Sequence, residues 1–154
     1  METLACYETK LGLLLVACDG GAVTRLQWVE EMPRTNAPTP LSDEAAEQVR
    51  AWLDGRRESF ALPLDPRGTD FQRAVWRQVR AIPYGQTRSY SDIAAALGRP
   101  KAVRAVGAAI GRNPIWLAIP CHRVVGKNGA LTGYAGGLER KRFLLDLERG
   151  GKSR

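Results

Sequence analysis

The sequence predicts an α+β protein, in which a small amino-terminal antiparallel sheet with one helix precedes a mostly helical domain that contains a helix-turn-helix. Two observations predict this fold class. Apolar runs of strand length, separated by glycine-containing turns, occupy residues 4–29. From residue 69 onward, apolar side chains recur at helical spacing. A chain of 154 residues can form one compact domain or two small ones.

The formal charge changes sign along the chain. Residues 1–66 hold 6 Lys/Arg and 11 Asp/Glu, a net charge of −5, whereas residues 67–154 hold 17 Lys/Arg and 5 Asp/Glu, a net charge of +12. Pro63 and Pro66 bracket the change, so we place a domain boundary near residue 65 and expect domains at 1–65 and 66–154. A basic surface can be merely solvated, but an excess of this size favours a polyanionic partner.

The first domain is expected to begin with a meander of strands. Leu13–Cys18 is an apolar run of strand length, and Asp19–Gly21 supplies turn residues that tolerate a positive φ before a return strand begins at Ala22. An earlier turn is expected at Lys10–Gly12. Three prolines in Pro33–Pro40 predict a loop. The segments that follow predict a helix that starts at Ser42, carries Val49, Trp52 and Leu53 on its apolar side, and ends at Gly55.

The second domain is expected to hold four helices. Thr69 can cap the first, and Ser89 or Ser91 the second. A tight turn at Gly98–Pro100 separates the second helix from the third, which Gly111 closes. The first helix is expected to stop at Ile82–Gly85 and the second to run through Ile93 to Leu97. The third is expected from about Lys101 to Ile110 and the fourth from about Leu138 to Arg149.

The second and third of these helices, joined by a short turn, resemble a helix-turn-helix. A helix that reads the major groove needs polar side chains to match base edges, and residues 101–110 offer almost none. The small residues there suit close approach to a narrow groove, with Arg104 as the main long side chain. An alanine-rich buried helix is the alternative, but the charges of Lys101 and Arg104 count against complete burial.

The chain contains three cysteines, Cys6, Cys18 and Cys121, and a single histidine, His122. An odd number of cysteines argues against a disulfide framework, and the acidic start Met1-Glu2-Thr3 does not resemble a signal peptide. We therefore expect a cytoplasmic protein, and no apolar run is long enough to predict a membrane span. Three Cys and one His could in number bind zinc, but without a CxxC pair we expect no metal site.

Cys121 and His122 are neighbours in Ile119-Pro120-Cys121-His122-Arg123-Val124. A thiol with the ordinary pKa of about 8.5 is mostly protonated at neutral pH, so a nucleophilic cysteine needs a base. An imidazole can accept the proton directly or through a water, and a carboxylate on its other nitrogen would orient it. Adjacency alone does not establish this arrangement, because sequence neighbours point apart in most backbones.

This segment resembles the active-site signature of the O6-alkylguanine-DNA alkyltransferases, also called methylated-DNA–protein-cysteine methyltransferases. The resemblance is close over residues 66–150 and only general in the amino-terminal part. Other segments match the family in order and at family spacing: Gly68–Gln72, Val75-Trp76, Ile82–Thr87, Ser89-Tyr90, Arg104–Gly107, Asn113-Pro114 and Tyr134–Gly137.

The resemblance implies a catalytic set. Cys121 would accept the alkyl group irreversibly and stoichiometrically, and His122 would act as its base through a water. Glu148 would complete a relay from carboxylate to histidine to water to thiol, and Asn113 would brace the turn that carries the acceptor. The product is a thioether, which has no electrophilic carbonyl for water to attack. No cofactor site is evident, so we expect each molecule to act once.

The resemblance also implies the partner, double-stranded DNA bound through the minor groove. Tyr90 would help to rotate the damaged nucleotide out of the helix and would donate a hydrogen bond to guanine, and Arg104 would fill the gap in the base stack. Extrusion is needed because O6 of guanine is otherwise paired and stacked. We expect a monomer, with cooperative assembly on DNA left open.

The pocket for the base would be formed by residues around the acceptor. Tyr134 would form its wall, Lys141 would lie near the guanine ring, and the carbonyls of Cys121 and Val124 would bind the exocyclic amine. Ala135 replaces a serine frequent in the family, although its backbone N–H could still donate to O6. Two more residues are expected near the pocket and could limit the size of the alkyl group: Trp116 and Thr132.

Two other functions are considered. A non-catalytic lesion-binding protein, of the alkyltransferase-like kind, commonly has tryptophan in place of the acceptor cysteine, and Cys121 argues against it. A transcription regulator would need base-reading side chains and usually a dimer interface. The sequence shows neither, and it does not decide the preferred alkyl group or whether O4-alkylthymine is accepted.

Overall fold

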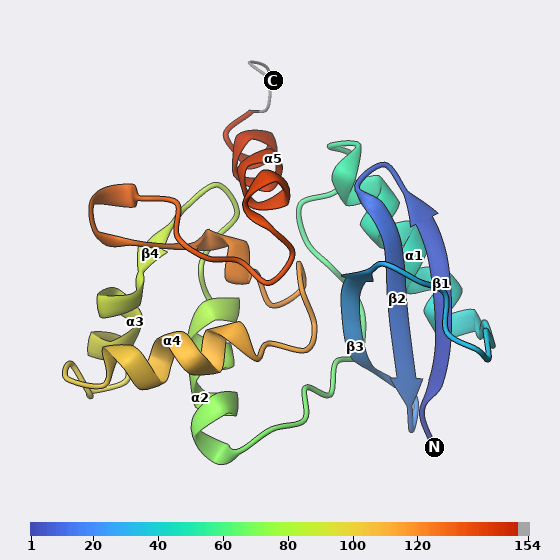
Figure 1. The fold of residues 1–154 in the computed structure, drawn as a ribbon, viewed down its shortest axis with the longest axis horizontal. Coiled ribbons are helices and arrows are strands. Elements are labelled where there is room, and N and C mark those ends of the chain that lie inside the picture. The colour runs from blue at the N-terminus through green and yellow to red at the C-terminus, as the bar shows by residue number, and fades with distance from the viewer. Residues whose placement is uncertain (151–154) are drawn as a thin grey trace. The chain divides into compact units, whose positions relative to one another are not determined.

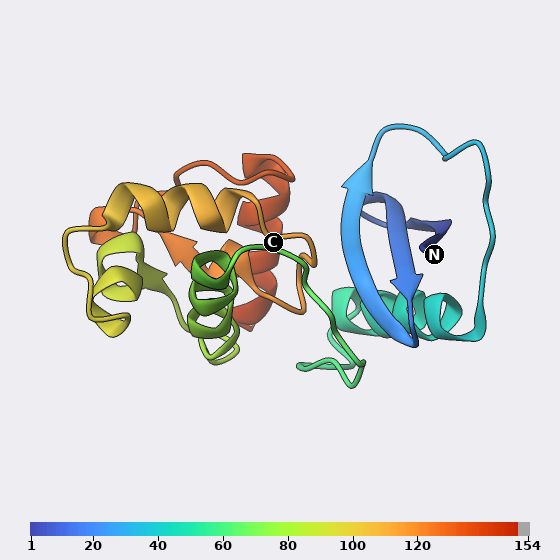
Figure 2. The ribbon, with the colours of Figure 1, turned by 90° about the horizontal axis from the view of Figure 1, so that it is seen from below.

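Three antiparallel strands, β1 (Thr3–Thr9), β2 (Gly12–Asp19) and β3 (Ala22–Val29), form a sheet in the order β1-β2-β3 (Figure 1). Helix α1 (Pro40–Leu53) lies across one face of this sheet (Figure 2). The computed structural model describes residues 1–150, and the last residues of the expected second domain, 151–154, lie outside the described part. The predicted amino-terminal sheet with a helix is confirmed.

The turn between β2 and β3 depends on two glycines. Gly20 and Gly21 have φ values of 60° and 83°, and Asp19 pairs directly with Ala22. A two-residue hairpin turn of this kind requires a positive φ at both central positions, which costs glycine little. The turn predicted at Asp19–Gly21 is confirmed, and it sets the register of the pairs beside it, up to the shift between Ala17 and Cys18.

The described residues form two compact units, and the first contains a segment distant in sequence. It comprises Met1–Arg67 and Pro114–Trp116, and the second comprises Gly68–Asn113 and the chain from Leu117 onward. Within the first unit, the Leu26 N–H donates to the Pro114 carbonyl at 2.8 Å and the Trp116 N–H donates to the Leu26 carbonyl at 2.7 Å. A boundary placed near residue 65 does not anticipate this return of the chain to β3.

Helix α1 starts two residues before the expected position. Thr39, not Ser42, is the N-cap: its side chain accepts from the Ser42 N–H, while the Ser42 hydroxyl accepts from the Thr39 N–H. Pro40 is part of the helix and not of the preceding loop, because proline suits the first helical position, where an N–H has no partner within the helix.

The second unit contains α2 (Asp70–Arg80), α3 (Tyr90–Ala96), α4 (Val103–Gly111) and α5 (Leu138–Glu148). Capping boxes begin α2 at Thr69 and α3 at Ser89. Helices α2, α3 and α4 pack against one another (Figure 2), and the Trp76 indole N–H donates to the Ala109 carbonyl at 2.8 Å. The predicted helical domain, with α3 and α4 as its helix-turn-helix, is confirmed.

Three local features of the second unit differ from expectation. Helix α4 begins at Val103 and not at Lys101, because the Ala102 N–H closes a turn onto the Arg99 carbonyl at 2.9 Å. Gly111 is the last helical residue, and Arg112 follows as the cap. Two short strands, β4 (Arg88–Ser89) and β5 (Val124–Val125), pair in parallel. Strands of two residues are too short to produce a period in the sequence.

None of the helices formed by residues 1–150 combines the length and the apolar character that crossing a bilayer demands.

Candidate active site

Cys121 begins a 3-10 turn, η1 (Cys121–Arg123), that follows Pro120. The thiol is buried, with 6% of the residue exposed. The Ile119 carbonyl accepts from the Cys121 N–H at 2.7 Å and from Asn113 Nδ2 at 2.8 Å. Asn113 lies just beyond α4, so its buried amide links the end of that helix to the turn that carries the sulfur.

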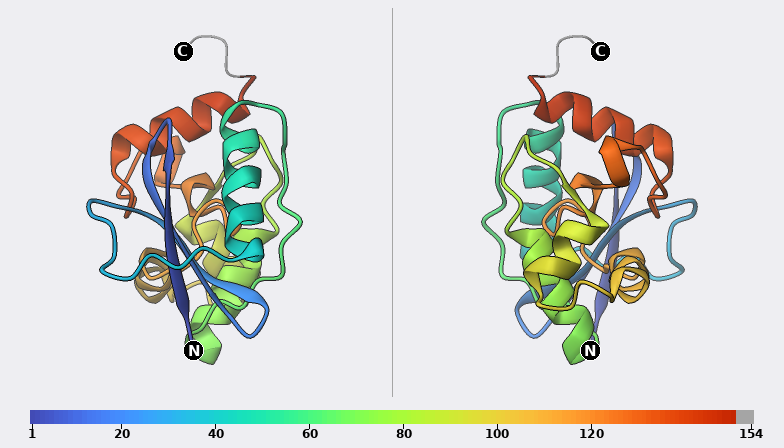
Figure 3. Two further views of the ribbon diagram at one scale, coloured as in Figure 1. Left: turned by 90° about the vertical axis from the view of Figure 1, so that its right-hand side faces the viewer. Right: turned by 90° about the vertical axis from the view of Figure 1, so that its left-hand side faces the viewer.

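The His122 side chain is fully buried and meets Glu148, the last residue of α5, with 2.6 Å between His122 Nε2 and Glu148 Oε2. Helix α5 packs against η1, which allows this contact between residues far apart in sequence (Figure 3). Burial lowers the pKa of His122, although Glu148 opposes the shift. A neutral imidazole facing a carboxylate carries its proton on Nε2, because an ionised carboxylate only accepts hydrogen bonds.

Arg123 completes the buried charge pair and was not anticipated from the sequence. Its Nε donates to both oxygens of Glu148, at 2.8 and 3.0 Å, and Nη1 donates to the Ile82 carbonyl at 2.7 Å. Its guanidinium lies 5.5 Å from the centre of the Tyr84 ring. The sequence offered one signal, since a buried glutamate in a strongly basic domain needs a cation. That signal does not say which arginine supplies it.

Glu148 is therefore held from three directions, because the Gly85 N–H also donates to Oε1 at 3.0 Å. Burial by itself would raise the pKa of Glu148, but the hydrogen bonds and charges of His122 and Arg123 outweigh it and lower the pKa. The carboxylate is thus ionised and fixed beneath the imidazole. It can stabilise a positive charge that forms on His122 when that ring accepts a proton.

The resting state of Cys121 is a thiol. Burial raises its pKa to about 11, although the Asn113 amide and the Lys141 ammonium act in the opposite direction. At pH 7 only on the order of 10⁻⁴ of such a thiol is ionised. The site therefore contains a protected sulfur that needs a base, and His122, the next residue in the chain, is paired with Glu148.

Lys141 lies on α5 with its ammonium buried beside the acceptor segment. Its Nζ donates to the Val124 carbonyl at 2.6 Å and to the Thr132 carbonyl at 3.2 Å. Burial lowers the pKa of Lys141, and the nearby Cys121 opposes this shift. The lysine thus contacts two backbone carbonyls, one of which belongs to Val124, a predicted site residue.

Most of the remaining predicted residues lie in the second unit, but Trp116, which was expected near the pocket, belongs to the first unit. Tyr90 is the first residue of α3 and is half-buried, and it lines an open groove of about 580 Å³. Tyr134 is half-buried, and burial together with the proximity of Cys121 raises its pKa. Ala135 is exposed next to it. Arg104 is exposed on α4 and forms no ion pair or hydrogen bond within residues 1–150.

Over residues 1–150, His, Cys, Asp and Glu side chains form no group of three or more that could hold a metal ion.

Both halves of the chain match known protein families. Residues 4–66 match the ribonuclease-like domain, and residues 70–150 the DNA binding domain, of 6-O-methylguanine DNA methyltransferase. A constitutive methylated-DNA–protein-cysteine methyltransferase from Bacillus subtilis (strain 168) is 49% identical, in an alignment that covers 97% of this chain and 96% of that protein. A methylated-DNA–protein-cysteine methyltransferase from Methanosarcina barkeri is 46% identical over 92% of this chain and 93% of its own length.

Solved structures of members of this family are similar to this chain over nearly its whole length. The crystal structure of the Mycobacterium tuberculosis O6-methylguanine methyltransferase has a TM-score of 0.88 and 41% sequence identity, covering 99% of this chain and 95% of that one. The complex of that organism's protein with DNA has a TM-score of 0.89 and 44% identity, covering 97% and 94% of the two chains. With family matches over both halves and close relatives over nearly its whole length, this chain belongs to the 6-O-methylguanine DNA methyltransferase family.

Proposed function

We propose that the protein repairs DNA by transferring the alkyl group of O6-alkylguanine to Sγ of Cys121, once per molecule. The observation that carries this proposal is the buried set of Cys121, His122 and Glu148 in a member of this family. The transfer makes the chain a methylated-DNA–[protein]-cysteine S-methyltransferase that is consumed by its own reaction. Whether O4-alkylthymine is a second substrate is a question for the same assay.

The proposed reaction starts with loss of the thiol proton. Because His122 Nε2 faces Glu148, the other ring nitrogen, Nδ1, takes the proton of Cys121 through a water. Sγ then attacks the alkyl carbon: the S–C bond forms, the C–O6 bond breaks, and O6 takes the electron pair. The guanine anion that results takes one proton at N1 and leaves in its keto form, while the imidazolium of His122 gives up the thiol proton through the same water, so that no net proton is gained or lost. Glu148 stabilises the imidazolium, while Arg123 offsets the charge of Glu148.

Lesion binding uses the residues around the acceptor. Tyr90 assists rotation of the nucleotide and donates to guanine, and Tyr134 forms the wall of the pocket. The carbonyls of Cys121 and Val124 accept from the exocyclic amine, and the Ala135 N–H donates to O6. Support for this assignment is the position of Lys141, whose ammonium orients the Val124 carbonyl at 2.6 Å and raises the tendency of the adjacent thiol to ionise.

Helix α4 binds duplex DNA from the minor groove, and Arg104 replaces the rotated base in the stack. Support comes from the exposed face of α4, where Arg104 stands among the small exposed residues Ala105 and Ala108. Small side chains permit close approach to sugar-phosphate walls, and an arginine without an ion pair keeps its charge available for phosphate. Residues 66–154 form the DNA-binding and acceptor domain, and residues 1–65 support the fold.

The proposal includes the place and state in which the protein works. Its substrate is cellular DNA, and its cysteines Cys6, Cys18 and Cys121 are free thiols, which fits the reducing cytoplasm. It acts as a monomer, and cooperative assembly on DNA is tested by the steepness of its binding isotherm.

Incubation with O6-methylguanine duplex DNA, followed by mass measurement of the protein, tests the proposal. We expect a gain of one methyl group per molecule, located on Cys121, and no further gain with excess DNA. Cys121→Ala should bind DNA but gain no mass, whereas Cys6→Ala, which removes a buried thiol of the first unit, should gain it. Transfer by Cys121→Ala would refute the proposal. Tight lesion binding without any gain of mass in the unaltered chain would favour the lesion-binding alternative instead.

A further inference from the structure

The hydroxyl of Tyr90 is bonded to a second hydroxyl, that of Thr132. Thr132 Oγ1 donates to the Tyr90 phenolic oxygen at 3.2 Å, across 42 residues of sequence. Tyr90 opens α3, while Thr132 lies in the segment between β5 and α5. Both residues are half-buried. The bond therefore connects the helix-turn-helix to the segment that leads to the pocket residue Tyr134.

Thr132 is held in place from two sides. Its carbonyl accepts from Lys141 Nζ at 3.2 Å. Its methyl group packs against Gly126 so closely that a Cβ on that glycine would lie 2.7 Å from Thr132 Cγ2. With the methyl group against Gly126, the hydroxyl of Thr132 points toward Tyr90. Gly126 thus makes room for a defined rotamer of Thr132.

A second route also connects Tyr90 to Lys141. Lys141 also donates to the Val124 carbonyl at 2.6 Å, and Val124 pairs with Arg88 of β4, two residues before Tyr90. Tyr90 is therefore tied to the same buried ammonium twice, through its own backbone and through its hydroxyl. Its ring passes Gly107 of α4, where an added Cβ would be 3.8 Å from Tyr90 Cδ1. A side chain restrained at both ends keeps few alternative positions.

We infer that Thr132 is a positioning residue for nucleotide rotation: it supplies a proton to the Tyr90 oxygen, so that the single phenolic proton of Tyr90 is directed to the substrate. This rests on the proposed function, in which Tyr90 donates to the rotated guanine. A phenol has one proton to donate. When its oxygen accepts a hydrogen bond, the direction of the O–H bond is fixed and the phenol becomes a stronger donor.

The test compares Thr132→Val, which keeps the shape and removes the hydroxyl, with Thr132→Ser, which keeps the hydroxyl. The measurements are the single-turnover rate at saturating O6-methylguanine duplex and the affinity for the same undamaged duplex. We expect Thr132→Val to slow transfer roughly fivefold, the effect of one ordinary hydrogen bond. We expect Thr132→Ser to transfer at nearly the original rate, with the affinity for undamaged DNA unchanged in both.

A double-mutant cycle keeps the test valid if Thr132→Val is less stable. In a Tyr90→Phe background the phenolic oxygen is gone, so Thr132→Val should slow transfer no further. Gly126→Ala should reproduce the loss by displacing Thr132, whereas Gly133→Ala, where nothing lies within 4 Å of an added Cβ, should not.

The outcomes separate the two proposals. Equal rates for Thr132→Val and the unaltered chain, equal losses for the Val and Ser variants, or a further loss in the Tyr90→Phe background would each overturn the role of Thr132 while leaving the transfer reaction intact. Absence of transfer by the unaltered chain would instead overturn the proposed function.

Discussion

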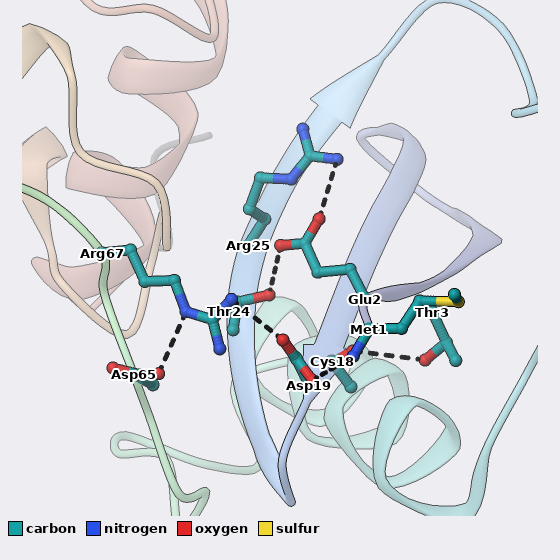
Figure 4. A network of polar contacts seen from close by, with 9 residues as sticks. All are labelled: Met1, Glu2, Thr3, Cys18, Asp19, Thr24, Arg25, Asp65 and Arg67. Atoms are coloured by element: carbon teal, nitrogen blue, oxygen red, sulfur yellow. Dashed lines mark hydrogen bonds and ion pairs between the residues drawn. The ribbon is translucent and has the colours of Figure 1, made fainter.

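The two units use their charged groups in opposite ways. In the first, acidic side chains meet cations at the surface: Asp19 pairs with Arg67 at 3.0 Å, and Asp54 with Lys10 at 2.8 Å (Figure 4 shows the Asp19 network). In the second, Glu148 is buried with His122 and Arg123, while the exposed Arg73, Arg77 and Arg104 form no ion pair within residues 1–150.

Surface ion pairs and buried ion pairs differ in what they contribute to stability. Exposed ion pairs contribute little to stability, because water screens them and the side chains lose entropy. A buried pair is costly to desolvate, and an apolar replacement is often as stable. We propose that the second unit keeps its buried charges for chemistry at Cys121 and leaves surface cations available for a polyanion. The first unit pairs several of its acidic side chains at the surface, and we propose that it supports the fold.

Removing the base should have the largest effect. If His122 is the general base, as we propose, His122→Gln should slow alkyl transfer by roughly 10²- to 10⁴-fold, the usual contribution of general acid–base catalysis. Single-turnover transfer from methylated duplex DNA measures it. Thr24→Val removes a buried hydroxyl that bonds Glu2 in the first unit, and serves as the control. Equal rates for the two variants would show that the buried network is not catalytic.

Breaking the buried ion pair should destabilise the protein. Glu148→Gln leaves the Arg123 guanidinium buried without a full counter-charge, and we expect the free energy of unfolding to fall by roughly 3–5 kcal/mol. Denaturant titration measures the change. Asp146→Asn, on the same helix and 3.9 Å from the exposed Arg149, is the matched control and should change stability little.

Lowering the pH should destabilise the protein through the buried side chains of the second unit. Burial lowers the pKa of His122 below its ordinary 6.5, so below pH 6.5 the unfolded chain binds a proton that the folded chain does not. Stability is therefore fully present above pH 6.5 and falls as the pH drops from there toward the folded pKa. The pKa of Glu148 is also lowered from its ordinary value of 4.5, so a second loss of folding stability begins below pH 4.5. His122 is the only histidine, so His122→Asn should flatten the first loss.

The free surface cations should matter for duplex DNA and not for the chemistry. Arg104→Ala should slow transfer from duplex DNA several-fold more than reaction with free O6-methylguanine, because the free base needs no extrusion. Arg34→Gln, an exposed arginine of the first unit, should change neither rate. If Arg104→Ala slowed both reactions equally, extrusion would not be its role.

The smallest effect is expected in the surface network of the first unit. Asp19→Asn removes contacts with Arg67 and with the terminal ammonium of Met1, yet it should leave the midpoint of denaturant unfolding unchanged within error. A loss as large as that of Glu148→Gln would remove the distinction between the two units.

Sequence alone determined the features that depend on neighbours within a few residues. The glycine turn at Gly20-Gly21 and the cap Thr69 follow from local conformational preference and from hydrogen bonds that span three residues. Apolar runs of strand length and apolar residues at helical spacing led to the fold class, and the family pattern around Cys121 led to the transfer reaction. Where a local rule offered two alternatives, Ser89 or Ser91 as the cap of α3, the structure selected Ser89. The expected helix start at Ser42 was wrong, because Thr39 caps α1.

The tertiary structure alone decided which distant groups meet. Glu148 is 25 residues from Arg123 and 63 from Gly85 in sequence, and Lys141 bonds Val124 and Thr132 from another helix. Any of the 17 cations in residues 67–154 could in principle balance a buried glutamate. Packing of α5 against η1 selects Arg123, because a desolvated charge is stable only where geometry brings its partner within hydrogen-bond distance.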